Sequence, residues 1–586
     1  MDSGRPLGDS PLFGLLPPRL QDELVAAGVP VQVPAQEWLF REGDPGDRLY
    51  AIVSGRVRVV ADREGDARIL TTLGPGAVIG ELAVLTGASR SASVQAVRDT
   101  ALLEIDGQAF ADLLQRDPQL GAGLARALAE RLQSGGSTEP SQAPVSVVTV
   151  VCATRGREEH LWSALCAAFD EMGRAAVVSG QPSEWTNLES WGARLGDLEH
   201  DHEHVVLRAD LESSEWTGFC LRQADRVVVV ASGDARPALA LPSGVDVVFL
   251  GVPSPDDVAA WTVPTSARAH HVVPPDARLD AAAGRIARRV TGRSLGLVLS
   301  GGGARAFAHM GVLEVFAGEG IVPDRIGGTS MGAFVGALTA LGWDPATMVQ
   351  VCDTELARRA PFSDYTFPRY ALIRARRAAS LLRRLFGDTA VEQLEVPLFT
   401  VSADLVSSQM VVHRTGPLFE AVGASMAIPG LAPPLARHRS LLVDGGVLNN
   451  LPIDVMVESE RGPVVAVDVM RRLDVTDETD LAEVLPTILE TLSRATVLGS
   501  VSRAESNRPL CDVLIAPDVQ SVPLRGFRRL HEAVDAGRRA AEDALAAGAK
   551  ETIERGLRGE VGPRTASRSA DGSRVDERVS SPAAMR

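Results

Sequence analysis

The stretch that decides the fold reads S-L-G-L-V-L-S-G-G-G-A-R-A-F-A-H-M-G-V-L and runs from Ser294 to Leu313. Its apolar segment, Leu295 to Leu299, ends in three consecutive glycines and is followed by helix-like periodicity. A second short segment, Asp324 to Ile326, leads into G-G-T-S-M-G at 327–332, where another helical pattern begins. Each is predicted as a strand, a tight glycine turn and a helix start, which directs backbone N–H groups outward at a positive helix end. The first turn is suited to hold an anion and the second to present a serine, so together they indicate acyl transfer.

The serine of the second turn, Ser330, lies in the pattern G-x-S-x-G between Gly328 and Gly332. In this pattern the serine occupies a sharp strand-to-helix turn, and glycines two residues away on either side prevent steric collision. Alone, the pattern is more often an ordinary helix cap. Here the three glycines at 301–303 add N–H donors that could hold a tetrahedral oxyanion.

A third piece follows the apolar strand Leu441 to Val443, where Asp444, Gly445 and Gly446 stand in sequence. An aspartate at a strand end before two glycines can reach into a cleft and act as a base. The alternative is an ordinary Asp-Gly turn.

These three pieces, in this order, resemble the patatin-like phospholipase family, whose signatures are a glycine-rich oxyanion loop, G-x-S-x-G, and D-G-G or D-G-A. The resemblance covers about residues 294 to 470 and implies a three-layer α/β/α serine esterase with a Ser-Asp dyad. By position, Ser330 would be the nucleophile and Asp444 the base. The oxyanion site would comprise Gly301, Gly302, Gly303 and Arg305. The family's G-G-G-x-R-G has Ala306 as its last residue here, so we expect a shift in loop detail without loss of activity.

The continuation V-D-G-G-V-L-N-N-L-P-I-D-V-M, from Val443, is similar to the branch that contains neuropathy target esterase. This resemblance implies hydrolysis of lysophospholipids, and in some members phospholipids, at a membrane or micelle surface. It implies no cofactor and no metal for catalysis. Headgroup, chain length and sn-position stay open, as does the oligomeric state.

The first 133 residues contain short β-type runs punctuated by glycine, typical of a small β-roll. They resemble a cyclic nucleotide-binding domain, most specifically at Gly80-Glu81-Leu82 and Arg90-Ser91. The resemblance implies that Glu81 accepts hydrogen bonds from a ribose hydroxyl and that Arg90 pairs with the cyclic phosphate of cAMP or cGMP. Such domains often lose the ligand and persist as packing modules, so occupancy stays open. No helix-turn-helix follows, which disfavours a transcription factor.

Composition sets the outer limits. The chain has 586 residues, 45% hydrophobic and 23% charged, and a net charge of −16, which disfavours nonspecific nucleic-acid binding. Five scattered cysteines indicate a reducing cytoplasm. No signal peptide or membrane span is expected, so we place the protein in the cytoplasm, with peripheral contact at the inner membrane face left open.

The domain prediction divides the chain into six parts. Residues 145–290 read as an α/β layer with a parallel sheet, because buried strands alternate with helical stretches; we expect a regulatory or spacer role. Within it, E-H-D-H-E-H (Glu199 to His204) is either a metal ligand set or, more often, a solvated polar loop. The parts are 1–133 (cyclic nucleotide-binding-like), 134–144 (linker), 145–290 (middle unit), 294–470 (catalytic core), 471–555 (helical extension) and 556–586 (disordered tail).

Two further stretches of the catalytic unit stand out. Arg369 to Phe386 carries six arginines on a helix-compatible pattern, which indicates either contact with lipid headgroups or a cap helix paired with the protein's own carboxylates. Met426 to Pro434 is an apolar, proline-broken loop that could line an acyl channel. His309, in the helix after the glycine loop, is predicted to be a packing residue.

Two alternative functions stay open. One is an α/β-hydrolase with a Ser-Asp-His triad, for which His438 and His531 are the histidines nearest to Asp444 in sequence. The order of motifs argues against it. The other is a nucleotide-sensing scaffold with an inactive hydrolase domain, against which stands the presence of both dyad residues.

Overall fold

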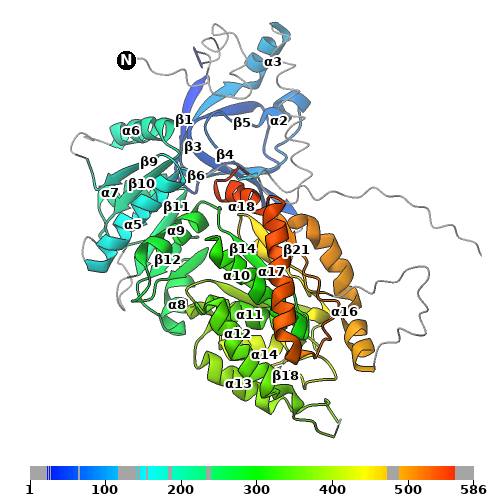
Figure 1. Cartoon of the computed structure of the whole chain (residues 1–586). Coiled ribbons are helices and arrows are strands. Elements are labelled where there is room, and N and C mark those ends of the chain that lie inside the picture. The colour runs from blue at the N-terminus through cyan, green and yellow to red at the C-terminus, as the bar shows by residue number, and fades with distance from the viewer. Residues whose placement is uncertain are drawn as a thin grey trace, which may run out of the picture.

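The computed structural model describes residues 23, 25–26, 28–63, 66–116, 141–142, 145–153, 156–182, 188–231, 239–367, 369–470 and 488–560. It contains three sheets, each with its own hydrophobic core. Figure 1 shows the β-roll at one end of the molecule and the C-terminal unit, with α13 (Arg376–Phe386), at the other. Along the described stretches, no helix is both long and apolar enough to cross a membrane.

The N-terminal unit is an antiparallel β-roll with flanking helices, as predicted. Its alternating strands bury Tyr50, Ile52, Val57, Val94 and Leu102 in a common core. The short helix α2 begins at Glu81, directly after Gly80. The amphipathic stretch Leu12 to Val29 and the stretch Phe110 to Gln133, which has helical spacing of its apolar residues, lie largely outside the described residues. The elements are β1 (Val29–Val33), β2 (Trp38–Phe40), β3 (Arg48–Arg63), β4 (Asp66–Leu73), β5 (Val78–Ile79), α2 (Glu81–Thr86), β6 (Ser93–Asp106), α3 (Gly107–Arg116) and β7 (Ser141–Gln142).

Strand β7 comes from the stretch predicted as a linker. It pairs in parallel with β4, through Thr71 with Ser141 and Thr72 with Gln142, so these residues belong to the sheet of the β-roll. The rest of 134–144 lies outside the described residues.

The middle unit is a parallel sheet of order β13-β12-β11-β8-β10-β9 with helices on both faces. Continuous valine runs form the central strands because both faces are covered: α5 and α9 pack on one face and α6, α7 and α8 on the other. The bounds are β8 (Val147–Val151), α5 (Gly156–Met172), β9 (Ala175–Ser179), α6 (Leu188–Asp201), β10 (His204–Ala209), α7 (Glu215–Gln223), β11 (Arg226–Ala231), β12 (Asp246–Phe249), α8 (Pro255–Thr262), β13 (Ala269–Val272) and α9 (Leu279–Val290).

The C-terminal unit is the predicted three-layer α/β/α fold. Its sheet has the order β18-β19-β16-β15-β14-β20-β21, with β17 paired to β16. Helices α10, α11, α14 and α17 cover one face, while α15 and α16 lie on the other. The strands are β14 (Gly296–Leu299), β15 (Arg325–Thr329), β16 (Leu398–Asp404), β17 (Gln409–His413), β18 (Leu435–Arg437), β19 (Ser440–Asp444), β20 (Val464–Val467) and β21 (Val513–Ile515). The helices are α10 (Ala308–Gly318), α11 (Met331–Ala340), α12 (Pro345–Cys352), α13, α14 (Leu418–Ser425), α15 (Ile453–Ser459), α16 (Ile488–Asn507), α17 (Leu530–Ala546) and α18 (Ala549–Leu557).

Two details differ from the sequence prediction. The stretch expected to be a helical extension also contains β21, which pairs in parallel with β20 and completes the sheet. The helix expected over Arg369 to Phe386 begins only at Arg376, and before it an isolated antiparallel bridge joins Tyr365 and Ile373. Beyond α18, residues 561–586 of the predicted tail lie outside the described residues.

Buried ion pairs join the three units. Arg98 of β6, fully buried, donates to Glu199 Oε1 of α6 over 2.7 Å. On the other side of the middle unit, Arg289 of α9 is paired with Glu460, which follows α15. Buried ion pairs therefore hold the middle unit against both of its neighbours.

Candidate active site

The functional turns meet because their strands are parallel neighbours. Strand β14 pairs with β15 in the register Leu299 to Gly328, so the loops that follow the two strands leave the sheet at the same edge. Strand β19 runs antiparallel to β16, with Asp444 opposite Ser402, and this brings its end to the same level. Residues from three distant parts of the chain thus converge at one edge, the usual location of sites in α/β sheets.

Ser330 occupies a strained turn. Its backbone has φ 55° and ψ −126°, a conformation that non-glycine residues rarely adopt and that is typical of a nucleophile elbow. The flanking glycines are required because the backbone segments around Ser330 pack too closely for a side chain. A Cβ on Gly328 would lie 2.7 Å from the Gly332 carbonyl carbon, and one on Gly332 would lie 2.3 Å from Leu299 O. The Ser330 N–H donates to Ser425 Oγ over 2.8 Å, which fixes the turn against α14.

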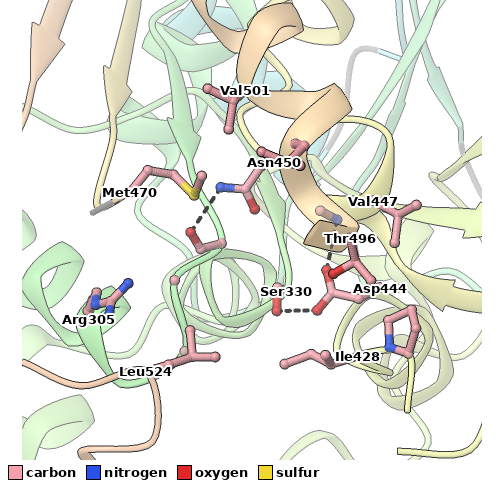
Figure 2. A pocket seen from close by; sticks show the side chains of 16 residues that line it. Arg305, Ser330, Ile428, Asp444, Val447, Asn450, Met470, Thr496, Val501 and Leu524 are labelled. Atoms are coloured by element: carbon pink, nitrogen blue, oxygen red, sulfur yellow. Dashed lines mark hydrogen bonds between the residues drawn. The ribbon is translucent and has the colours of Figure 1, made fainter. Parts of the chain in front are cut away.

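Asp444 accepts a hydrogen bond from Ser330 over a 2.5 Å distance between Oγ and Oδ2 (Figure 2). Its other oxygen, Oδ1, accepts from the Gly446 N–H over 2.8 Å, so the carboxylate is held in one orientation. Both residues are buried, at 6% exposure each. Burial raises the pKa of Asp444 to about 6, although the hydrogen bonds from Ser330 and Gly446 oppose the shift.

The glycine loop at 301–303 lines the same pocket as Ser330 and Asp444. A Cβ on Gly301 would approach Asn450 Oδ1 to 2.6 Å, so no larger residue fits. The Gly301 N–H, one of the three donors predicted for an oxyanion, donates to the Asn450 main-chain carbonyl over 3.2 Å in this structure. Within the described ranges, the amides of Gly302 and Gly303 have no intramolecular acceptor, so both could donate to an anion in the pocket.

Apolar side chains form the rest of the pocket. Ile428 and Pro429 line it, as predicted for the proline-broken loop. The sequence reasoning missed Asn450, whose Nδ2 donates to Gly301 O over 3.1 Å, and the wall that α16 contributes. The only available signal for Asn450 was its proximity to the D-G-G motif. The remaining lining residues that were not predicted are Val447, Met470, Thr496, Leu498, Val501 and Leu524.

The arginine and the histidines have clear positions. Arg305 lines the pocket, but its Nε donates to Val522 O over 2.8 Å, which anchors the loop at 521–525. His309 is buried with Nε2 on Ser300 O, the packing role that was predicted, and burial lowers its pKa to about 4. His438 and His531 are exposed and do not line the pocket. Among the described residues, no histidine lines the pocket that holds Ser330 and Asp444.

In the β-roll, Arg90 is the notable side chain. It is 4% exposed, and its Nη1 donates to Gly80 O over 3.3 Å. Its guanidinium lies 4.2 Å from the centre of the Phe40 ring. Among the described residues Arg90 has no carboxylate within ion-pair distance, and burial lowers its pKa. Glu81 is buried at the start of α2, whereas Leu82 and Ser91 are exposed.

The acidic, histidine-containing stretch of the middle unit is neither a metal cluster nor a solvated loop. Glu199 lies in α6 and accepts from Arg98, while His204 begins β10 and packs against Phe169 at 5.7 Å between ring centres. No group of metal-binding side chains was found in the part of the chain that the structure describes. After β8, where a P-loop would hold phosphate, the Glu158 carboxylate instead accepts from the Ala153 N–H over 2.6 Å.

Three protein-family profiles match this arrangement. Residues 297–457 match the patatin-like phospholipase family, residues 30–117 the cyclic nucleotide-binding domain, and residues 172–241 the P-loop-like domain of the neuropathy target esterase (NTE) family. A solved N-terminal domain of a Streptomyces coelicolor A3(2) transcriptional regulator is 33% identical, covers 22% of this chain and 91% of that chain, and has a TM-score of 0.20.

Relatives cover most of the chain. An NTE family protein of Mycobacterium tuberculosis is 34% identical over 548 residues, which are 88% of this chain and 91% of that protein. Patatin-like phospholipase domain-containing protein 7 of Rattus norvegicus is 30% identical over 77% of this chain, and Lysophospholipase NTE1 of Cryptococcus neoformans is 28% identical over 88% of it. In both cases the match spans 38% of the longer relative.

Fold, elbow and profiles together define a patatin-like phospholipase that carries an N-terminal domain of the cyclic nucleotide-binding type. The identity to the mycobacterial protein over nearly its whole length places the chain more narrowly. It belongs to the NTE family.

Proposed function

We propose that this chain is a serine hydrolase that cleaves the carboxylic ester bonds of lysophospholipids, and of phospholipids as a wider class, through a Ser330–Asp444 dyad. The observation that carries the proposal is the hydrogen bond between these two buried side chains on a strained elbow. The lysophospholipase name of the fungal relative supports the substrate class.

The reaction begins when Ser330 Oγ attacks the ester carbonyl carbon and its proton passes to Asp444 Oδ2. The carbonyl oxygen becomes an oxyanion, which the amides of Gly302 and Gly303 stabilise. Collapse breaks the bond to the alcohol, which leaves as the deacylated lipid after it takes the proton from Asp444. Water then attacks the acyl-serine with Asp444 again as base, releases the fatty acid and restores the serine. Burial supports this role, because a carboxylate with a pKa near 6 is a stronger base than a solvated one.

Hydrolysis of a purified lysophosphatidylcholine, followed by fatty-acid release, tests the proposal. The intact chain should turn over the lipid, and Ser330→Ala and Asp444→Asn should each lower kcat by at least about a thousandfold while the folded protein persists. Full activity in Ser330→Ala would contradict it. Release of no acid by the intact chain from any of a panel of lysophospholipids and phospholipids would favour the alternative, a scaffold with an inactive hydrolase domain.

We further propose that the β-roll binds a cyclic nucleotide, cAMP or cGMP, as a regulatory ligand. A buried arginine without a carboxylate partner among the described residues supports this, because an anion would complete its charge. Calorimetric titration of the intact chain with each nucleotide should give binding that Arg90→Gln abolishes and Arg41→Gln leaves unchanged, since Arg41 is an exposed arginine of the same unit. The absence of binding for both nucleotides would leave the β-roll as a packing module.

This function would place the protein in the cytoplasm, at the inner membrane face. The five cysteines are all free, which accords with a reducing compartment. The middle unit would act as a regulatory element or as a spacer between the other two units, because its ion pairs join it to both of them.

A further inference from the structure

Residues 364–367 and 369–377, called here the aromatic–arginine loop, precede α13 and include its first two residues, and they present aromatic side chains to solvent. Phe367 is 88% exposed, Tyr370 is 73% exposed and Tyr365 is 61% exposed. In the described part of the chain these are the only exposed phenylalanine, tyrosine or tryptophan side chains. Exposed aromatic residues within so short a stretch need an explanation, since a folded monomer gains nothing from leaving them in water.

Arginines surround the aromatic residues. Arg369, Arg374, Arg376 and Arg377 are exposed, and among the described residues none of them forms an ion pair with a carboxylate. Arg376 and Arg377 begin α13, where the helix dipole disfavours positive charge, and only Asp364 compensates by accepting from the Arg376 N–H over 2.9 Å. The free protein would be more stable without this arrangement, so the positive charge is expected to serve an external anionic partner.

This loop borders the mouth of the pocket. Leu372 and Ile373 donate backbone hydrogen bonds to Gly430 and Leu431, which directly follow the pocket residues Ile428 and Pro429 (2.9 and 3.0 Å). Ile428 also packs with the Ile373 cluster, so one side chain contacts both the pocket and the loop.

The opposite side of the mouth is tied to the same loop. Arg525 donates to the Tyr365 hydroxyl over 3.1 Å and to Phe362 O over 3.2 Å, and it follows the pocket residue Leu524. Figure 2 shows Leu524 and Ile428 on either side of Ser330. In Figure 1, α13, which follows the loop, lies at the end of the molecule farthest from the β-roll.

We propose that the aromatic–arginine loop is the surface by which the protein docks on an anionic lipid bilayer, with Phe367 and Tyr370 inserted at the headgroup level and the four arginines on the phosphates. Aromatic rings favour the membrane interface, and each arginine near an anionic surface adds to attraction. Because the chain as a whole carries a net charge of −16, unpaired arginines grouped beside the pocket mouth would orient the protein with that mouth toward an anionic bilayer. This inference rests on the proposed function, because it names the surface from which the lipid enters.

The test separates docking from chemistry by using the full chain with Ser330→Ala, which leaves vesicle lipid intact. Sedimentation with vesicles of phosphatidylcholine alone, or with about 30 mol% phosphatidylglycerol, measures binding. We expect binding to the anionic vesicles that falls with salt. Phe367→Ala with Tyr370→Ala should weaken it at least about tenfold, and Arg369→Gln, Arg374→Gln and Arg376→Gln together should remove the preference for anionic vesicles.

Matched controls are available elsewhere on the surface. Val322→Ala shortens an apolar side chain of 61% exposure that precedes β15, at the sheet edge opposite the pocket. The combination Arg194→Gln, Arg278→Gln and Arg558→Gln makes the same charge change at exposed sites away from the loop. Both controls should bind vesicles within about twofold of the parent.

The outcomes are distinguishable from failure of the proposed function. With Ser330 restored, the loop variants should hydrolyse a soluble short-chain ester within about twofold of the parent and lose activity only on vesicle lipid. Vesicle binding through the loop without ester hydrolysis would refute the hydrolase and leave docking intact. The docking proposal would be overturned if the loop variants bound vesicles like the parent. It would also be overturned if the parent bound neither kind of vesicle, and a protein partner would then be the better explanation of the exposed loop.

Discussion

A Cβ atom placed on Gly301 would lie 2.9 Å from the Cβ of Ser330. The glycine loop and the nucleophile elbow are therefore in direct contact, and the hydroxyl can approach the loop amides only because residue 301 has no side chain. The two motifs, read separately in the sequence, form a single packed unit in the fold.

Gly301→Ala tests this contact. The added methyl group would displace either Ser330 or Asn450, whose Oδ1 lies 2.6 Å from the same Cβ position. We expect kcat to fall by about two to three orders of magnitude, comparable to loss of an oxyanion donor. Steady-state kinetics with a soluble ester measures the effect, and Gly318→Ala is the control, because that helical glycine has no atom within 4 Å of its Cβ position. Equal activity of both variants would show that the contact is not required.

The acidity of Asp444 predicts a pH profile. Only the ionised carboxylate accepts the serine proton, and burial raises its pKa to about 6. The ratio kcat/KM should therefore rise through about pH 6 and level off above it, as rates of soluble ester hydrolysis across that range will show. A profile that is already flat from about pH 4 would mean that the group acting as base is a solvated carboxylate.

The same shift predicts a stability difference. Because the folded pKa lies above the unfolded value of about 3.9, the native state binds the proton more tightly, so this stabilisation is full below about pH 4 and is lost as pH rises through 6. The asparagine of Asp444→Asn does not ionise, so the variant does not lose this stabilisation. The difference in melting temperature, variant minus parent, should therefore increase between about pH 4 and about pH 8, by the equivalent of up to roughly 3 kcal/mol. A difference independent of pH would contradict the raised pKa.

Much of the site could be predicted from sequence because its chemistry resides in short motifs with strict glycine requirements. The elbow at Ser330 and the aspartate at the end of β19 are recognisable because few backbone conformations satisfy them. The parallel pairing of β14 and β15 then follows from strand–helix alternation, and it brings the motifs to one edge.

What could not be predicted depends on long-range packing. The Gly301 amide is occupied because it donates to the carbonyl of Asn450, which lies 149 residues away in the sequence. Leu498 and Val501 of α16 carry no local signal for lining a pocket. The helix expected from Arg369 begins only at Arg376, because the Asp364 carboxylate caps it there and the preceding loop pairs its backbone with Gly430 and Leu431.

The junction between the β-roll and the middle unit depends on Asp225. Its Oδ1 lies 3.0 Å from Arg56 Nε and 3.6 Å from Arg98 Nε, and both arginines are buried. Asp225→Ala would remove the carboxylate that Arg56 and Arg98 share and leave only Glu199 beside Arg98, so it should destabilise the junction by about 3–5 kcal/mol. Limited proteolysis and thermal melting should register an earlier first transition.

The control for this junction is Asp280→Ala, which removes an exposed partner of Arg278. That change should alter stability by no more than about 0.5 kcal/mol. A similar melting curve for both variants would show that the buried pairs do not hold the two units together.

The triad alternative makes a separate prediction. His531 and His438 are exposed and lie outside the pocket lining, so His531→Ala and His438→Ala should retain kcat within about twofold. Ester hydrolysis by each purified variant decides the matter. A loss of several orders of magnitude in either one would favour a Ser-Asp-His mechanism.

Covalent labelling with an organophosphonate, read by peptide mass spectrometry, tests the central assignment most directly. A dyad in which Ser330 donates to Asp444 over 2.5 Å should place the phosphonyl group on the Ser330 peptide. The rate of labelling should fall by at least about a hundredfold in Asp444→Asn, and the adduct should be absent in Ser330→Ala. An adduct on another residue, or equal labelling rates in the parent and Asp444→Asn, would contradict the assignment.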